Sequence, residues 1–417
     1  MEQNTVARTT AGRAALLVGA LCSVYFFSQF LRNSIGVIAP EIAAEFAMSP
    51  AVLSLLASSF FISFAAVQIP LGIAIDHFGA IRSMTVLMGL TIVGCVVFAS
   101  ADTASGLIAG RAIMGLGCSA FFMAPLTIYT RWFGPQRFST LVGLTLGIGS
   151  FGSLAVTTPL ALLSGAVGWR TAFLVVAAAS AVVFVFCLAI ARERPPGAAA
   201  PPRAASLSAV LKDFPAVFRV HGVARLFVMH CFTYSIFATM LGLWAGPYFS
   251  DVHGLDLTAR GNALFVFAMA QITALLVWGP ADRLMGGHKL PVTIGALATI
   301  VMLCVIAFSD SLPVGWVIAE FALLGVAAAY TPVLTAHGRA LFELSMVGRG
   351  MTLMNIGTMG GVVVLQLATG QIVGWLSEGH SIRDPHAYRA AFLFIAAMLA
   401  LALVFYRRAP EGIAEKQ

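Results

Sequence analysis

The chain has 417 residues, of which 59% are hydrophobic and only 10% are charged, and its mean hydropathy is +0.94. Soluble globular domains carry about a quarter charged residues, so this composition excludes an ordinary soluble protein and predicts an integral membrane protein. The net charge is +7, but the excess basic residues fall in short loops and need no nucleic-acid partner. The six cysteines stand singly inside apolar segments, without the spacing of a metal site, so we expect neither a metal nor a cofactor.

Twelve apolar segments are each long enough to cross a bilayer, which takes roughly 20 residues. They predict an all-α membrane protein with twelve transmembrane helices. The longest loop, 192–222, is rich in Pro and Ala and is predicted to be a cytoplasmic linker. It separates a six-helix bundle over 1–191 from a second over 223–408, and 409–417 form a cytoplasmic tail. The predicted spans are 14–39, 50–75, 82–101, 103–129, 138–164, 169–191, 223–248, 260–281, 289–309, 313–336, 349–376 and 387–406.

The distribution of Lys and Arg predicts the orientation. Two of the 24 basic residues, Arg32 and Arg111, lie within predicted spans. If the N-terminus is inside, only four others fall outside, namely Arg170, Arg260, Arg383 and Arg389. Because cytoplasmic loops carry the excess of basic residues, both termini are predicted to be cytoplasmic. The first apolar run is too long for a signal peptide and is expected to stay as the first helix, in a bacterial inner (plasma) membrane.

The two halves repeat one another. Trp169-Arg170-Thr-Ala-Phe173 opens the sixth span, and Tyr388-Arg389-Ala-Ala-Phe392 opens the twelfth. Prolines occur inside the fourth and tenth spans at matching positions. Halves of this kind are typical of transporters that bind their solute between two repeats.

The loop after the second span reads Gly72-Ile-Ala-Ile-Asp76-His77-Phe-Gly79-Ala-Ile-Arg82 and resembles the loop signature of the major facilitator superfamily. His77 replaces the usual basic residue of that signature. The fourth span carries Arg111-Ala-Ile-Met-Gly115-Leu-Gly117, which is similar to another pattern of the family. The fifth span lacks the Gly-Pro-x-x-Gly-Gly signature of the drug antiporters in this family.

This resemblance implies two pseudo-symmetric six-helix bundles that rock about a central site lined by spans 1, 4, 7 and 10. It also implies a conformational latch on the cytoplasmic side. A carboxylate at a helix end can cap a neighbouring helix or pair with a basic residue, and glycine permits a tight turn or close approach. The expected latch residues are Gly72, Asp76, Gly79, Arg82, Asp282 and Arg283.

Three ionisable residues sit inside predicted spans that the resemblance assigns to the cavity. They are Arg32, Arg111 and Glu320. At 1.5 Å per residue, each lies about 10–12 Å from the outer end of its helix, so all three share one layer. We hypothesise that Glu320 binds the coupling proton and pairs with Arg111 or Arg32 when the outer side is closed. A permanent structural ion pair is the alternative.

Arg32 is the expected receptor for an anionic group of the solute. Tyr25, Gln29 and Arg32 share one face of the first helix, and an arginine inside a membrane usually faces a bundle interior or a water-filled path. Guanidinium groups can grip a carboxylate or phosphate with two hydrogen bonds. A structural or snorkelling arginine is the alternative. The other expected substrate-binding residues are Tyr25, Gln29, Asn33, Tyr234, Trp244, Gln271, Asn355 and Gln366.

The leading functional hypothesis is a proton-coupled uptake transporter, expected as a monomer, for a small organic anion or an amino-acid-like solute. Its partners are then the anionic or zwitterionic solute, a coupling proton and the lipid bilayer. An exporter of an amphiphilic compound is the alternative, in which aromatic side chains matter more than Arg32. A transporter-like receptor is a third class, but the linker and tail are too short for a signalling module. The sequence shows no nucleophile–base set and no phosphate-binding loop, so an enzyme is not predicted.

Overall fold

The computed structural model describes residues 2–133, 135–193, 217–343, 346–377 and 384–411. In this part of the chain the regular secondary structure is entirely helical. Eleven helices are long and apolar enough to cross a membrane, and a twelfth span results if the bent pair Pro50–Ala66 and Gln68–Phe78, at 46°, counts as one. The all-α prediction is therefore confirmed. Most of the expected linker 192–222, and the tail beyond residue 411, lie outside the described residues.

Spans of the first bundle are interrupted more often than the hydropathy pattern predicts. The first span breaks at Ser34 and continues through Pro40 to Glu45, whereas the sequence predicted an end near residue 39. The helices of the first bundle are α1 Glu2–Asn33, α2 Ile35–Glu45, α3 Pro50–Ala66, α4 Gln68–Phe78, α5 Ala80–Ala99, α6 Ala104–Cys118, α7 Ala120–Trp132, α8 Pro135–Ala155, α9 Thr158–Val167 and α10 Trp169–Ile190.

In the second bundle the seventh span departs furthest from a single helix, because it includes a π-helical segment. Such segments are rare and occur frequently at functional sites. The helices of this bundle are α12 Val223–His230, α13 Tyr234–Thr239, η1 Met240–Trp244, α14 Ala245–Asp251, α15 Leu257–Trp278, α16 Ala281–Leu284, α17 Lys289–Ala307, α18 Val314–Ala327, η2 Ala328–Tyr330, α19 Thr331–Ala340, α20 Val347–Leu376 and α21 Pro385–Tyr406.

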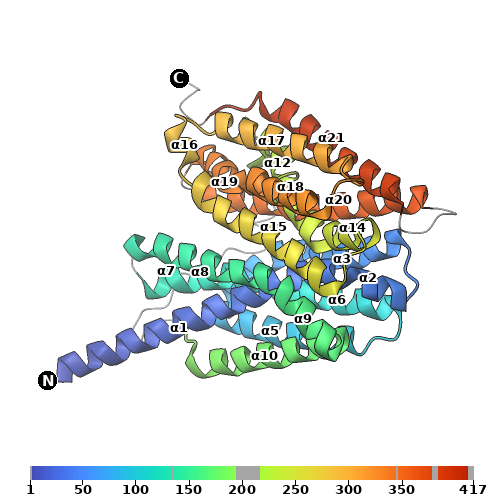
Figure 1. Ribbon diagram of the computed structural model, residues 1–417. Coiled ribbons are helices and arrows are strands. Elements are labelled where there is room, and N and C mark those ends of the chain that lie inside the picture. The colour runs from blue at the N-terminus through green and yellow to red at the C-terminus, as the bar shows by residue number, and fades with distance from the viewer. Residues whose placement is uncertain (1, 134, 194–216, 344–345, 378–383, 412–417) are drawn as a thin grey trace.

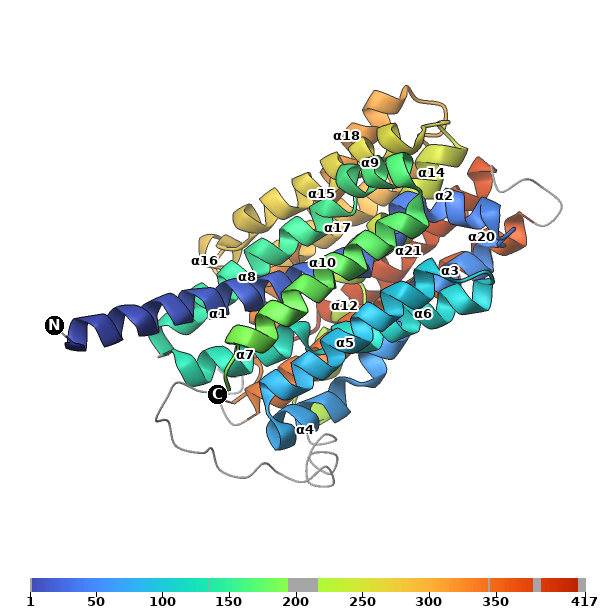
Figure 2. The same cartoon turned by 90° about the horizontal axis from the view of Figure 1, so that it is seen from below.

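Figure 1 shows the two bundles side by side, the first in blue to green and the second in yellow to red. We call the end that holds Phe78 and Tyr406 the terminal end, because α1 begins and α21 ends there, and the end that holds Glu45 and Asp251 the distal end. The ribbons of the bundles converge at the distal end and diverge toward the terminal end (Figure 1). Figure 2 shows α5 and α10 on the outside of the first bundle, where their apolar side chains suit a lipid environment.

The repeated motif at the start of the sixth and twelfth spans makes equivalent contacts in each bundle. Trp169 Nε1 donates to Glu45 at 2.8 Å, and the Tyr388 hydroxyl donates to Asp251 at 2.6 Å. The adjacent arginines both donate to a backbone carbonyl, Arg170 to Ala101 at 3.1 Å and Arg389 to Ala307 at 3.0 Å. The sequence repeat therefore corresponds to a structural repeat that ties the distal ends of the helices within each bundle.

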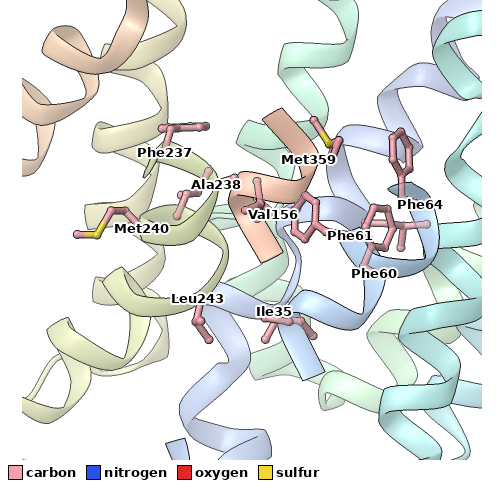
Figure 3. Close-up of a cluster of buried hydrophobic side chains, with 14 of the residues drawn as sticks. Ile35, Phe60, Phe61, Phe64, Val156, Phe237, Ala238, Met240, Leu243 and Met359 are labelled. Carbon is pink, nitrogen blue, oxygen red and sulfur yellow. The ribbon is translucent and has the colours of Figure 1, made fainter. Parts of the chain in front are cut away.

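Backbone contacts between the bundles are closest at the distal end. A Cβ atom added to Gly36 would lie 1.9 Å from the Leu241 carbonyl oxygen, and one added to Gly246 would lie 1.7 Å from the Gly36 carbonyl oxygen. Glycine at both positions therefore lets α2 pack directly against η1 and α14. Figure 3 shows an apolar cluster in the same region, to which both bundles contribute. It includes Ile35, Phe60, Phe61, Phe64, Val156, Phe237, Leu243 and Met359.

Candidate functional site

Arg32 lies on α1 between the two bundles and is 7% exposed. Its guanidinium carbon is 5.0 Å from the ring centre of Phe64 in the first bundle and 5.9 Å from that of Tyr234 in the second. Its Nε atom is buried without a hydrogen-bond partner. The ionisable side chains that interact electrostatically with the Arg32 guanidinium are those of Tyr234, Tyr25 and Cys118, none of which is a carboxylate. The charge of Arg32 is therefore not neutralised by an ion pair among the described residues.

Arg111, on α6, is 1% exposed and makes different contacts. Its Nη1 donates to the Leu31 carbonyl at 2.5 Å and to Ser34 Oγ at 3.4 Å, and its Nη2 donates to the Arg32 carbonyl at 3.5 Å. The carbonyl groups near a helix end lack helical partners, so the break at Ser34 makes them available. Arg111 thus bonds to the broken end of the first helix, whereas the Nε of Arg32 has no partner.

The predicted neighbours of Arg32 on α1 divide into packing and ligand-accessible groups. Tyr25 packs against Gly149, where a Cβ atom would lie 2.3 Å from its ring. Asn33 donates to the Gln29 carbonyl at 3.3 Å and to Ser153 Oγ at 3.4 Å, which fixes its side chain inside the first bundle. The side-chain oxygens of Gln29 and Asn33 are buried and accept no hydrogen bond. Two acceptors therefore lie within one turn of Arg32.

Unpartnered donors come from both bundles. Gln68 lies one turn after Phe64, at the bend between α3 and α4, and its Nε2 atom is buried without a partner. The Tyr234 hydroxyl and both polar atoms of Gln366 are also buried without partners. Buried polar groups in proteins are nearly always hydrogen-bonded, so this concentration of unsatisfied groups indicates a place for water or a ligand.

Trp244, a predicted substrate-binding residue, packs within the second bundle in this structure. It is 1% exposed, its Nε1 donates to Thr369 Oγ1 at 2.7 Å, and its ring packs on Tyr388 at 5.9 Å. Trp244 is the last residue of the π-helical segment η1, which the spacing along the seventh span did not predict. Gln271 is 5% exposed on α15, and Asn355 is half-buried on α20. Among the described residues, neither forms a hydrogen bond with Arg32.

Glu320 does not form the expected pair with Arg111 or Arg32. The distal end is closed, yet none of the ion pairs in the described residues includes Glu320, and its Oε2 atom is buried without a partner. The nearby ionisable group is Tyr248 of α14, whose hydroxyl is likewise unpartnered. Equal depth along three helices did not imply contact, because depth leaves the direction of each side chain around its helix axis undetermined.

An ion pair that joins the bundles lies instead at the distal end, between Arg260 of α15 and Glu41 of α2. The Arg260 Nη2 is 2.5 and 2.7 Å from the two Glu41 carboxylate oxygens, and its Nε donates to the Val37 carbonyl at 2.9 Å. Sequence reasoning missed this pair. The available signal was that Arg260 is one of the four basic residues predicted to lie outside. In the structure it is only 2% exposed.

The predicted latch residues at the terminal end are not joined across the bundles in this structure. Asp76 and Arg82 are exposed, while Asp282 accepts from the Arg283 backbone at 2.8 Å. Gly79 has φ +95° and so needs glycine. Gly72 has no atom within 4 Å of an added Cβ, so the expected close approach there is absent.

Two carboxylates that the sequence did not single out cap helices at the terminal end. Glu193 accepts from the backbone N–H groups of Ala80 and Ile81, both at 2.9 Å, and also pairs with Arg131. Glu411 accepts from the first N–H groups of α17 in the same way, at 3.0 and 3.1 Å. Negative charge is favourable at a helix N-terminus. The two caps are a further expression of the structural repeat.

The profile of the Major Facilitator Superfamily matches residues 21–263 and 226–417, which together include nearly the whole chain. The chain belongs to this superfamily. Its members are transporters and not enzymes, so the family predicted from the loop signature and the twelve spans is confirmed.

Curated relatives transport anions. The chain is 31% identical to the probable sulfoacetate transporter SauU of Cupriavidus necator over 166 residues, which is 40% of this chain and 38% of that protein. It is 22% identical over 393 residues to the hexuronate transporter of Bacillus subtilis, with 90% of each chain covered. A nitrate/nitrite transporter, NrtP of Picosynechococcus, is 27% identical over 31% of this chain and 24% of its own length.

Solved structures with the same fold cover almost the whole chain. A bacterial homologue of the human lysosomal transporter Spinster, in an inward-facing and occupied conformation, has a TM-score of 0.78 at 16% identity, with 97% of this chain and 98% of that one covered. A D-xylose–proton symporter has a TM-score of 0.76 at 16% identity, with 95% and 98% covered. At this level of identity the likeness shows the fold alone.

Proposed function

We propose that this protein is a secondary active transporter that moves a small organic anion or an amino-acid-like solute by alternating access. The observation that carries the proposal is the buried guanidinium of Arg32, which lies between aromatic rings of both bundles without an ion-pair partner. A buried unpaired charge is costly unless a ligand of opposite charge neutralises it. The anion substrates named for the relatives agree with this role.

We further propose that the terminal end faces the cytoplasm of a bacterium and that the protein lies in its inner membrane. The positive charge of the loops at that end supports this orientation. The structure is then closed toward the outside by the Arg260–Glu41 pair and the glycine contacts of Gly36 and Gly246. Segments 1–191 and 223–408 would move as two bodies, joined by the linker 192–222.

Coupling to protons is proposed to act through Glu320. The carboxylate is half-buried inside α18, one of its oxygens has no partner, and no arginine pairs with it. Such a group can gain or lose a proton without breaking an ion pair, and ionisable residues inside membrane helices often serve as proton relays. Uptake driven by a proton gradient is therefore the expected direction of net transport.

The test of the anion site is a thermal-shift screen of the purified protein with carboxylates, sulfonates, amino acids and phosphate esters. Stabilising ligands should be anionic, and their effect should be lost in Arg32→Gln. The matched control is Arg407→Gln, because Arg407 is exposed after the last helix and should not affect binding. Equal stabilisation of both variants would refute the role of Arg32.

Export of an amphiphilic compound remains a second candidate, supported by the aromatic surroundings of the site. Phe64 and Tyr234 lie against Arg32, and Tyr25 packs on Phe122 with ring centres 5.0 Å apart. Uptake into inverted vesicles, compared with right-side-out vesicles under the same proton gradient, distinguishes the two directions. Accumulation of a hydrophobic cation that is unaffected by Arg32→Gln would favour export.

A further inference from the structure

Two buried arginines lie near the middle of the first bundle, but only one has its guanidinium available. Arg111 donates to two carbonyl groups of the first span and to Ser34, so its charge is solvated by the protein itself. The Arg32 Nε has no hydrogen-bond partner, and among the described residues no backbone carbonyl or carboxylate pairs with its guanidinium as the carbonyls of the first span pair with Arg111. A solute that binds between the bundles therefore meets one cation, although the sequence alone suggests two.

Two further arginines of the described residues are held in ion pairs. Arg260 pairs with Glu41, and Arg389 pairs with Asp310, both at the distal end. His230, on α12, is 3% exposed, and its Nδ1 lies 3.0 Å from the Leu226 carbonyl. That carbonyl is an acceptor only, so Nδ1 carries a proton, and a second proton on the buried Nε2 would have no acceptor. A neutral imidazole adds no positive charge.

The unpartnered groups around Arg32 are of two kinds. Gln68 Nε2 and the Tyr234 hydroxyl can donate to an anion that Arg32 binds. The side-chain oxygen of Gln29, one turn before Arg32 on α1, can only accept. An acceptor attracts a hydroxyl, amide or ammonium hydrogen and repels a second carboxylate, because two oxygens without a proton between them cannot form a hydrogen bond.

We infer that the site selects monoanions: a single carboxylate or sulfonate, with a neutral hydrogen-bond donor at the other end of a small molecule. Arg32, Gln68 and Tyr234 receive the anionic group, and Gln29 receives the donor. A dianion of the same size leaves one charge without a counter-ion in a buried site. The free-energy cost of burying that unpaired charge is the source of the selectivity. This inference rests on the proposed anion site and narrows its substrate class.

The test uses molecules of one shape and different charge. Succinate, succinamate and succinamide carry two, one and no negative charges on the same skeleton, and sulfoacetate and 2-hydroxyethanesulfonate form a second matched pair. Dissociation constants are measured with the purified full chain by microscale thermophoresis at neutral pH. We expect each monoanion to bind at least about tenfold more tightly than its dianionic partner, and this binding to be lost in Arg32→Gln but kept in Arg407→Gln.

A gain-of-charge variant checks the same idea in the opposite direction. Gln29→Lys places a cation one turn from Arg32 and should reverse the order, so that the dianion of each set binds more tightly. Dianions that bind wild-type protein as well as monoanions, through Arg32, would overturn the charge selectivity and leave the anion site intact. If no member of either set binds in a manner that depends on Arg32, the anion site itself is wrong.

Discussion

The distal ion pair offers the sharpest test of how this protein opens. Glu41→Gln removes the charge of the carboxylate that joins α2 to Arg260 but keeps its shape. Arg260 is 2% exposed and is held by both Glu41 oxygens and by the Val37 carbonyl. In the variant, the guanidinium keeps its carbonyl bond and one neutral acceptor, and it remains buried with an uncompensated charge.

The size of the effect follows from this geometry. Two unit charges about 4 Å apart attract by about 4 kcal/mol at an effective dielectric constant near 20. Removal of Arg260 from water offsets much of that attraction, and the Glu41 side chain is 36% exposed. A net contribution of about 1–2 kcal/mol to distal closure remains. The ratio of distally open to distally closed molecules should therefore rise about tenfold in Glu41→Gln.

Spin labels report the distal separation directly. With the native cysteines replaced, labels at Ala166 of α9 and Ser311 between α17 and α18 place one exposed probe on each bundle. Double electron–electron resonance should show a larger population at long distance in Glu41→Gln. The matched control is Glu45→Gln, because Glu45 lies one turn further along α2 and bonds only within the first bundle. An unchanged distribution in Glu41→Gln, or an equal change in Glu45→Gln, would refute the gate.

Three further predictions address the remaining parts of the mechanism. Arg111→Lys should lower the free energy of unfolding by about 2 kcal/mol, because lysine cannot reach the same carbonyl groups. Arg32→Lys should leave the thermal stability nearly unchanged. Equal losses of stability in the two variants, measured by calorimetry, would contradict these roles. In Gly246→Ala, the added Cβ overlaps the Gly36 backbone, so closure of the distal end should cost about 1–3 kcal/mol more and that end should stay open. Lower accessibility of cysteines placed at the distal end would contradict this. Glu320→Gln should abolish accumulation driven by a proton gradient but keep solute exchange, and normal accumulation would exclude its role in coupling.

Local patterns in the sequence were sufficient for the helical membrane spans and the family. Hydropathy is a property of each stretch of roughly 20 residues, so the spans could be predicted without tertiary information. The sequence repeat of Trp169-Arg170 and Tyr388-Arg389 corresponds to equivalent contacts in the structure, because both pairs lie at a helix start and bond to neighbouring helix ends. The expected position of Arg32 between two bundles followed from the same local information.

Which buried arginine is available for a ligand was decided only by the tertiary structure. Arg32 and Arg111 look equivalent in sequence, since each is a cation inside an apolar span at similar depth. The break at Ser34 exposes carbonyl groups that occupy Arg111 and leave Arg32 free, and no local pattern predicts that partnership across 80 residues. The Glu41–Arg260 pair spans 219 residues and depends on how the bundles meet. Depth along a helix can be counted from a sequence, but the direction of a side chain and its partner depend on packing between helices that lie far apart in the chain.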